Sequence, residues 1–183
     1  MTQVLRLLAA IAALSVTGAH PRTPRALPER IDDPVFWRMV NDLSEPGGHF
    51  RSDNFILNEG ELQYVINDLT RTVPRGRAYV GVGPEQNFTY IAAFEPGIAF
   101  IVDIRRQNMV QHLLLKALME TSADRAEFLS RLFSRPRPPG LDSITGVAEL
   151  FDAFDRAATD TAMFRRNLEA VRSHLVDENG FSG

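Results

Sequence analysis

Two glycines and one aspartate have the residue types and the spacing of a nucleotide-binding site. Gly81 and Gly83 follow a short β-type run, and Asp103 stands at the end of the next such run, 20 residues after Gly83. Glycine lets the backbone turn sharply and approach a ligand closely, and a strand-terminal acid can accept hydrogen bonds from both ribose hydroxyls of an adenosine. The alternative is a tight connection in which Asp103 only caps the next helix.

The residues after this glycine pair favour S-adenosylmethionine (SAM) over a dinucleotide. Dinucleotide sites prefer a third glycine at the position that Gln86 holds here. Glu85 would bring negative charge to the helix start where a pyrophosphate binds. SAM carries an amino group and a sulfonium and no phosphate, so acidic and amide groups suit it. Asp103 also disfavours a 2′-phosphate, which leaves NADP as a distant alternative.

Residues 78–103 resemble motif I and the following acidic position of class I SAM-dependent methyltransferases. A wider set of segments is similar to an uncharacterised bacterial family with a methyltransferase-like fold and no assigned reaction. These segments are SDN at 52–54, NE at 58–59, GVGPEQNFTYIAA at 81–93 and DIRRQN at 103–108.

This resemblance covers roughly residues 33–140 and implies a set of cofactor contacts. Gly81 and Gly83 would line the methionine part of SAM, Glu85 would lie near its amino group, and Asp103 would hold the ribose. The chain departs from the methyltransferase pattern because it lacks the third glycine of motif I and a recognisable acceptor-side motif. Catalytic residues therefore stay unassigned.

The loop that precedes this unit is unusually polar, and by the resemblance it would form a lid over the cofactor. Its four candidate residues are Ser52, Asp53, Asn54 and Glu59. Ordinary turn and capping chemistry explains the same residues equally well, since Asp and Asn bond their own backbone in turns. Tyr90 could stack on adenine, although a tyrosine at this position more often belongs to the core.

Other chemistry-bearing residues give weaker patterns. The chain has no cysteine, and its four histidines never stand at the spacing of helical metal ligands, so we expect no metal site. His112 could face the cleft or lie at the surface. A local basic cluster is either a solvated helix face or a contact for an anionic substrate or partner; its members are Arg125, Arg131, Arg135 and Arg137.

Hydrophobic periodicity predicts the elements that position the site. Ala78–Val82 and Ile98–Val102 have the pattern of strands, the second of them buried on both faces, and residues 88–94 have the pattern of a helix between them. Such a strand–helix–strand unit of about thirty residues fits one parallel crossover. Amphipathic stripes predict helices near 33–43 and 62–69, and only helices after Asp103.

These patterns predict an α/β fold: a Rossmann-like, methyltransferase-type parallel sheet at 33–140, followed by a helical segment at 141–183. Two parallel strands are not a stable sheet by themselves. We therefore expect the sheet to be incomplete in this chain, because of a truncated reading frame or a fragment, unless strands hide in segments that look helical.

Composition and the N-terminal residues limit the classes to which the protein can belong. The 183 residues carry a net charge of −3, without the basic excess of most nucleic-acid binders. Residues 1–19 have the layout of a secretory signal peptide, and their apolar run at 7–16 is too short to span a bilayer comfortably; a misassigned start codon or an amphipathic arm are the alternatives. Residues 20–32 contain PRTPRALP and are expected to form a linker.

Two functions follow as hypotheses. The first is a SAM-dependent methyltransferase-like protein with an unknown acceptor. The second is a non-enzymatic Rossmann-like protein of the cell envelope that binds a small-molecule ligand or a protein partner. A periplasmic or envelope location favours the second, because SAM is a cytosolic metabolite; a cytoplasmic location is the alternative. A hydride-transfer enzyme is a distant third.

Overall fold

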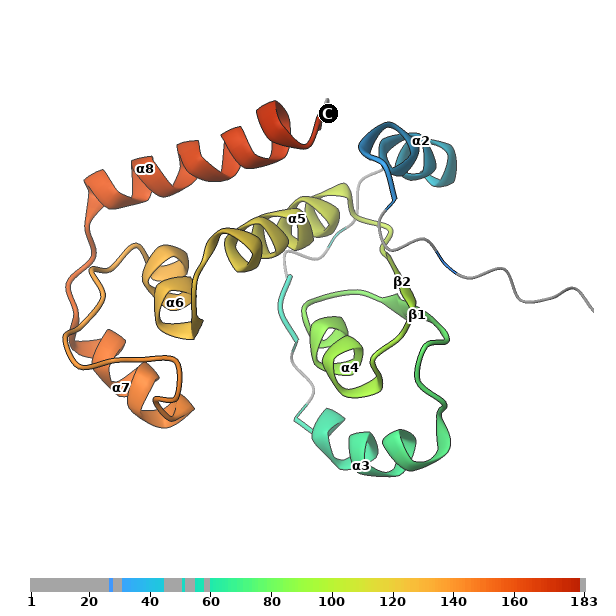
Figure 1. Cartoon of the computed structure of the whole chain (residues 1–183), viewed down its shortest axis with the longest axis horizontal. Helices are drawn as coiled ribbons and strands as arrows, with labels where there is room; N and C mark the ends of the chain where they lie inside the picture. Colours follow the sequence, from blue (N-terminus) through green and yellow to red (C-terminus); the bar gives the residue numbers. More distant parts are fainter. Residues whose placement is uncertain (1–26, 28–30, 45–50, 52–54, 58–59, 182–183) are drawn as a thin grey trace, which may run out of the picture.

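The computed structural model describes residues 27, 31–44, 51, 55–57 and 60–181 (Figure 1). In this part of the chain the architecture is α/β with a large excess of helix, as the sequence predicts. The predicted signal peptide at 1–19 and most of the predicted linker at 20–32 lie outside the described residues and stay predictions. No described helix combines the length and the apolar character that crossing a membrane would require.

A two-stranded parallel sheet holds the centre of the predicted unit. Strands β1 (Ala78–Val82) and β2 (Ile98–Val102) pair along their whole length, with Ala78 opposite Ile98 and Val82 opposite Val102. Helix α4 (Gln86–Phe94) connects them. Both predicted strands are confirmed at their predicted bounds, and α4 starts two residues before its predicted start. Within the described residues no third strand joins this pair, so the full Rossmann-like sheet is not seen.

The two faces of the sheet differ in what covers them. Tyr79 and Gly81 face α4, whereas Val80 and Val82 point to the opposite face because side chains alternate along a strand. Val80 is 69% exposed, Val82 is 68% exposed and Val102, which pairs with Val82, is 51% exposed. One face of this pair therefore leaves apolar side chains open.

Two helices precede the sheet. Helix α3 (Leu62–Thr72) packs against α4, as Figure 1 shows. Helix α2 (Asp33–Leu43) follows Asp32 at its N-cap position and has the predicted bounds. Trp37 fastens α2 to the C-terminal end of the chain, because its Nε1 donates to the carbonyl oxygen of Asn179 at 2.8 Å.

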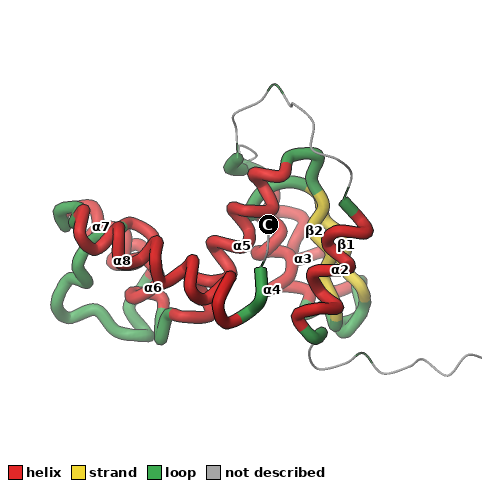
Figure 2. Tube along the Cα trace, turned by 90° about the horizontal axis from the view of Figure 1, so that it is seen from above, coloured by secondary structure: helices red, strands yellow, loops and turns green. Residues whose placement is uncertain are grey.

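A layer of helices follows the sheet, and α5 joins the two ends of the molecule (Figure 2). The elements are α5 (Arg106–Thr121), α6 (Arg125–Phe133), α7 (Val147–Arg156), α8 (Thr161–Arg172) and the π-helical turn η1 (Ser173–Glu178). Helix α8 packs against both α5 and α6. The aspartates before α6 and α8 cap these helices, since Asp124 accepts from Glu127 N and Asp160 accepts from Met163 N.

The apolar core lies among these helices rather than at the sheet. One cluster joins α6 to α7, and the other joins α5 to α8. The first contains Ala126, Leu129, Leu150 and Phe154, and the second contains Ala117, Leu118 and Val171. Both clusters join residues from either side of position 140, so α7 and α8 complete the core that α5 and α6 begin.

Candidate functional site

Gly83 makes the turn at the carboxyl end of β1. Its φ of +86° lies in the left-handed region, which glycine adopts without the strain that a side chain would add. Its backbone N–H donates to the carbonyl oxygen of Val102 at 3.1 Å, which ties the turn to the end of β2. The turn therefore lies where the carboxyl ends of two parallel strands meet, the edge at which open α/β sheets bind ligands.

Position 81 requires a glycine because neighbouring side chains leave no space for a Cβ. A Cβ at this position would lie 1.8 Å from the side-chain oxygen of Asn87 and 2.7 Å from the ring of Tyr79. The space beside Gly81 is therefore filled by the chain itself, whereas a Cβ on Gly83 would approach only the end of Gln86. Of the two predicted cofactor-lining glycines, both of them buried, only Gly83 leaves room beside its Cα for a Cβ-sized group.

Asn87 holds the turn together from the first turn of α4. It is only 1% exposed, and its Nδ2 lies 3.2, 3.2 and 2.8 Å from the carbonyl oxygens of Val82, Gly83 and Pro84. The Tyr79 hydroxyl donates to Asn87 Oδ1 at 2.7 Å. Burial raises the pKa of Tyr79, so the phenol stays a donor. From the sequence, Asn87 is expected only to cap the start of a helix, and its contacts with Tyr79 and three carbonyl oxygens become visible only in the structure.

Asp103 lies at the end of β2 as predicted, and its carboxylate already accepts four hydrogen bonds. Oδ1 accepts from the backbone N of Arg105 at 2.7 Å and from its Nε at 3.1 Å. Oδ2 accepts from the second guanidinium nitrogen at 3.3 Å and from Asn108 Nδ2 at 2.8 Å. Burial by itself raises the pKa of Asp103, but these hydrogen bonds and the Arg105 charge outweigh it and lower the pKa. All the lone-pair positions of the carboxylate are thereby used.

Glu85 has one engaged and one open carboxyl oxygen. Its Oε1 accepts from Leu57 N at 2.9 Å, while its Oε2 is buried and has no hydrogen-bond partner among the described residues. The ring of Phe55 lies 4.9 Å from the Arg105 guanidinium carbon. The described residues 55–57 thus contact Glu85 and the arginine that pairs with Asp103. The four predicted lid residues, Ser52, Asp53, Asn54 and Glu59, lie outside the described residues.

Glu85 is one of five residues near the turn that bury a polar atom without a partner in the described chain. These atoms are Glu85 Oε2, Gln86 Oε1, Asn108 Oδ1, Gln111 Oε1 and His112 Nδ1. Glu85 is the N-cap residue of α4 and Gln86 its first residue, and the other three lie on α5. Buried polar groups normally find partners, and each orphaned group carries a cost of about 1–3 kcal/mol. Such a concentration of orphaned atoms is typical of a site that a ligand completes.

The α5 members of this set share one helix face. Asn108, Gln111 and His112 follow the i, i+3, i+4 spacing that brings side chains together. His112 Nε2 lies 2.9 Å from the carbonyl oxygen of Gly83, and the His112 ring packs edge-on against Phe88 at 5.3 Å between centroids. Helix α5 therefore reaches the glycine turn through a polar face. The sequence predicts an apolar stripe on this helix and leaves His112 either in the cleft or at the surface. Val110, which belongs to that stripe, is in fact 48% exposed.

The orphaned atoms are all hydrogen-bond acceptors. A carbonyl can only accept, so His112 must donate from Nε2 to Gly83, and a neutral imidazole then carries a lone pair on Nδ1. The amide nitrogens of Gln86 and Asn108 donate to protein acceptors, which leaves their oxygens as the open atoms. Carboxyl, amide and imidazole acceptors around one turn suit a ligand rich in N–H and O–H donors.

Two other predicted candidates have structural roles. The ring of Tyr90 stacks on Phe94 at 5.7 Å and lies beside Tyr79, so it belongs to an aromatic cluster of the α4 face. The four arginines of the basic cluster bind backbone carbonyls and acids of neighbouring helices and loops. Arg125 donates to Thr145 O and Arg131 donates to Glu127. Arg135 donates to Phe154 O and Arg137 donates to Asp124.

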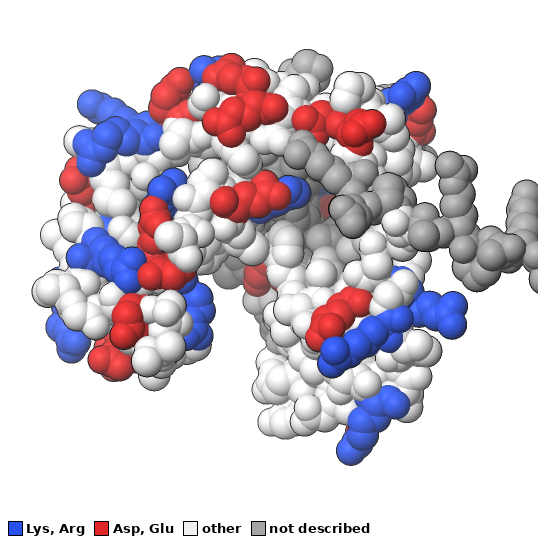
Figure 3. Space-filling model, viewed as in Figure 1, with Lys and Arg blue, Asp and Glu red and all other residues white. Residues whose placement is uncertain are grey.

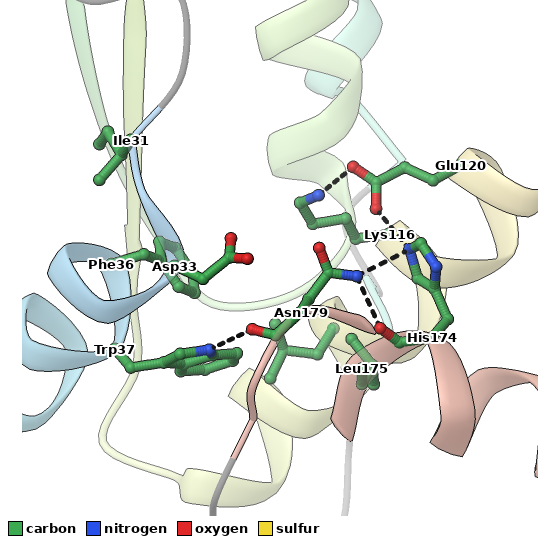
Figure 4. A pocket seen from close by; sticks show the side chains of 10 residues that line it. Ile31, Asp33, Phe36, Trp37, Lys116, Glu120, His174, Leu175 and Asn179 are labelled. Carbon is green, nitrogen blue, oxygen red and sulfur yellow. Dashed lines mark hydrogen bonds and ion pairs between the residues drawn. The ribbon is translucent and has the colours of Figure 1, made fainter. Parts of the chain in front are cut away.

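A separate pocket of about 490 Å³ lies between α2, α5 and η1 (Figure 4). Its wall includes the rings of Phe36 and Trp37. Its charged groups on α5 and η1 pair with one another: Glu120 bonds both Lys116 and His174, and the bond from Glu120 is the largest cause that raises the pKa of His174. Because these groups are satisfied, the pocket lacks the open acceptors of the Gly83 turn.

The wider described surface shows no candidate metal site. No three histidine, aspartate or glutamate side chains in the described ranges gather closely enough to hold a metal ion. On the face drawn in Figure 3, acidic and basic side chains lie intermixed over the helices.

Comparison with known families matches residues 55–179 to a family described as "Domain of unknown function (DUF7790)". The matched range contains the Gly83 turn, Asp103 and the polar face of α5, and it excludes α2. No curated protein and no solved structure matches the chain. Because the match spans more than half of the sequence, the chain belongs to the DUF7790 family of domains of unknown function.

Proposed function

We propose that the chain binds SAM, or a closely related ligand, at the Gly83 turn and is a methyltransferase-like protein whose acceptor is unknown. In this proposal the β1–α4–β2 unit is the nucleotide-binding end of a Rossmann-like domain. One observation carries the proposal: five buried acceptor atoms, on α4 and α5, lack partners in the described chain beside the strand ends. The ammonium and hydroxyl groups of SAM are donors of the kind that these atoms require.

Each residue would contact the group of the ligand that suits its chemistry. Glu85 Oε2 would accept from the α-ammonium group, since a carboxyl oxygen with a cationic donor gives the stronger, charge-assisted hydrogen bond. Asn108 Oδ1 and His112 Nδ1 would accept further donors from the α5 side, and Gly83 would let the ligand approach the backbone. Asp103 would hold the ribose. When bound, SAM supplies an electrophilic methyl group, and the chain's task is to position it.

Calorimetric titration tests this proposal. SAM, S-adenosylhomocysteine and NAD are titrated into the wild-type chain, Glu85→Gln and a control, Glu95→Gln. Glu95 lies at the far end of α4, where it pairs with the exposed Arg75. We expect SAM to bind wild type and the control equally, and Glu85→Gln to bind SAM about tenfold more weakly because the charged contact is lost. Wild type that releases heat with NAD but none with SAM would contradict the proposal.

A second candidate is a non-enzymatic domain that binds a protein partner through the sheet. The observation in its favour is the open face of Val80, Val82 and Val102, which parallel sheets normally cover. This candidate expects no heat with any of the three ligands. Sedimentation velocity on wild type and Val80→Lys then tests whether the partner is a second copy of the chain. If it is, a lysine buried between the two copies would dissociate the dimer.

A further inference from the structure

Arg105 stands where a ribose would have to bind. We propose that Arg105 gates the ribose position: its guanidinium competes with ligand hydroxyls for the Asp103 carboxylate and must leave it before an adenosine can bind. This inference rests on the proposed function. It adds that Arg105 controls the affinity for the nucleoside part of the ligand.

The hydrogen bonds of Asp103 divide into two kinds. Two of them come from the Arg105 side chain, from Nε to Oδ1 at 3.1 Å and from the terminal nitrogen to Oδ2 at 3.3 Å. The other two come from the Arg105 backbone N at 2.7 Å and from Asn108 Nδ2 at 2.8 Å. Departure of the guanidinium would free one acceptor position on each carboxylate oxygen and leave the two shorter bonds in place. Two hydroxyls of a ribose need these two positions.

The closed arrangement is well screened from solvent. The side chains of Arg105 and Asp103 are 11% and 9% exposed, so a ligand hydroxyl has little open access to the carboxylate while the arginine is in place. The guanidinium already lies 4.9 Å from the Phe55 ring centroid. A cation can remain attracted to an aromatic face at this distance, so the arginine keeps a favourable neighbour when it leaves Asp103.

The gate affects the two halves of the ligand differently. A free amino acid such as methionine would use Glu85 Oε2 and the α5 acceptors, none of which Arg105 occupies. A nucleoside would use Asp103 and must first displace the arginine. Removing the Arg105 side chain should therefore strengthen binding of nucleoside ligands and leave binding of methionine unchanged.

The experiment compares four full-length proteins: wild type, Arg105→Ala, Arg105→Lys and a control, Arg106→Ala. Arg106 is the exposed first residue of α5 and makes no described bond to Asp103. Adenosine, S-adenosylhomocysteine and L-methionine are titrated into each by NMR. We expect Arg105→Ala to bind adenosine and S-adenosylhomocysteine about tenfold more tightly, the worth of a charged hydrogen-bonded contact. Methionine affinity should be equal in all four proteins.

Arg105→Lys keeps the charge but loses the planar fork, so it should fall between wild type and Arg105→Ala. If Arg105→Ala does not fold, the affinity of Arg105→Lys for adenosine tests the gate. Adenosine affinity that is unchanged or weaker in the Arg105 variants, with methionine binding intact, would overturn the gate and leave the proposed function standing; Arg105 would then hold Asp103 in place. Absence of binding by any ligand to any of the four proteins would contradict the proposed function and the gate together.

Discussion

The imidazole of His112 donates from Nε2 to the carbonyl oxygen of Gly83 over 2.9 Å, across 29 positions of the chain. This hydrogen bond fastens the second turn of α5 to the glycine turn and leaves His112 Nδ1 buried and open. The same residue thus links the helical layer to the strand ends and presents an acceptor to the candidate site.

His112→Phe should separate these two roles. The phenylalanine ring can keep the edge-on packing against Phe88, and Gly83 O retains its bond from Asn87, so we expect a loss of about 1 kcal/mol in the free energy of unfolding. SAM binding should weaken by about tenfold or more, because the open acceptor is gone. Urea denaturation and calorimetry measure the two effects. Gln107→Ala, at an exposed position of the same helix, should change neither; SAM affinity unaffected by His112→Phe would remove His112 from the site.

Gly81→Ala should destabilise the protein by about 1–3 kcal/mol, the usual cost of forcing atoms into a packed space. The added Cβ would meet the Asn87 side-chain oxygen and the Tyr79 ring, which are already bonded to each other. The control is Gly60→Ala, since nothing lies within 4 Å of a Cβ there. Equal thermal midpoints for the two variants would show that the Asn87 side chain gives way without cost.

Phe154→Ala should be among the most destabilising changes in the described core, at about 3–5 kcal/mol. Phe154 is 1% exposed and packs with Leu129 and Leu150 between α6 and α7. Phe151, one turn earlier on α7, is 51% exposed, so Phe151→Ala should cost much less. Chemical denaturation of both variants tests whether the α6–α7 contact carries the stability; similar losses would argue against it.

Stability should depend on pH through His174 and Glu120. The bond to Glu120, then the bond to Glu178, raise the pKa of His174 above 6.5 against the opposing effect of burial. This stabilisation is complete below pH 6.5 and is lost as pH rises through the raised pKa. Burial raises the pKa of Glu120, but bonds from Lys116 and His174 outweigh it and bring the pKa below 4.5, so its contribution is lost as pH falls through that lowered pKa.

The pair therefore stabilises most between pH 4.5 and 6.5. Since Glu120 is 45% exposed, its effect should not exceed about 1 kcal/mol. Thermal melts of wild type and His174→Gln between pH 6 and 9 make the comparison. Wild type should lose stability across this range relative to the variant; parallel curves would show that another group governs the pH dependence. Glu178→Gln should shift the wild-type curve to lower pH, because it removes one carboxylate from the histidine.

Local sequence alone determined the secondary structure around the site. The strands at Ala78–Val82 and Ile98–Val102 and the turn between Gly83 and α4 were predictable, because apolar runs, glycines and helix-capping residues act over a few neighbours. The same local logic predicted that the described elements after Asp103 are helices. It also placed Gly83, Glu85 and Asp103 at one edge of the sheet, since parallel strands present their carboxyl ends together.

Only the tertiary structure decided what these residues contact. The filling of the Gly81 space by Asn87, the bond of His112 to Gly83 and the polar face of α5 depend on how helices pack across the chain, which no short pattern records. The closure of Asp103 by Arg105 is local in sequence but depends on a side-chain conformation that residue types leave open. Sequence thus brought the candidate residues together at one sheet edge, while packing and side-chain conformation determined which of their hydrogen-bonding groups lack a partner in the described chain.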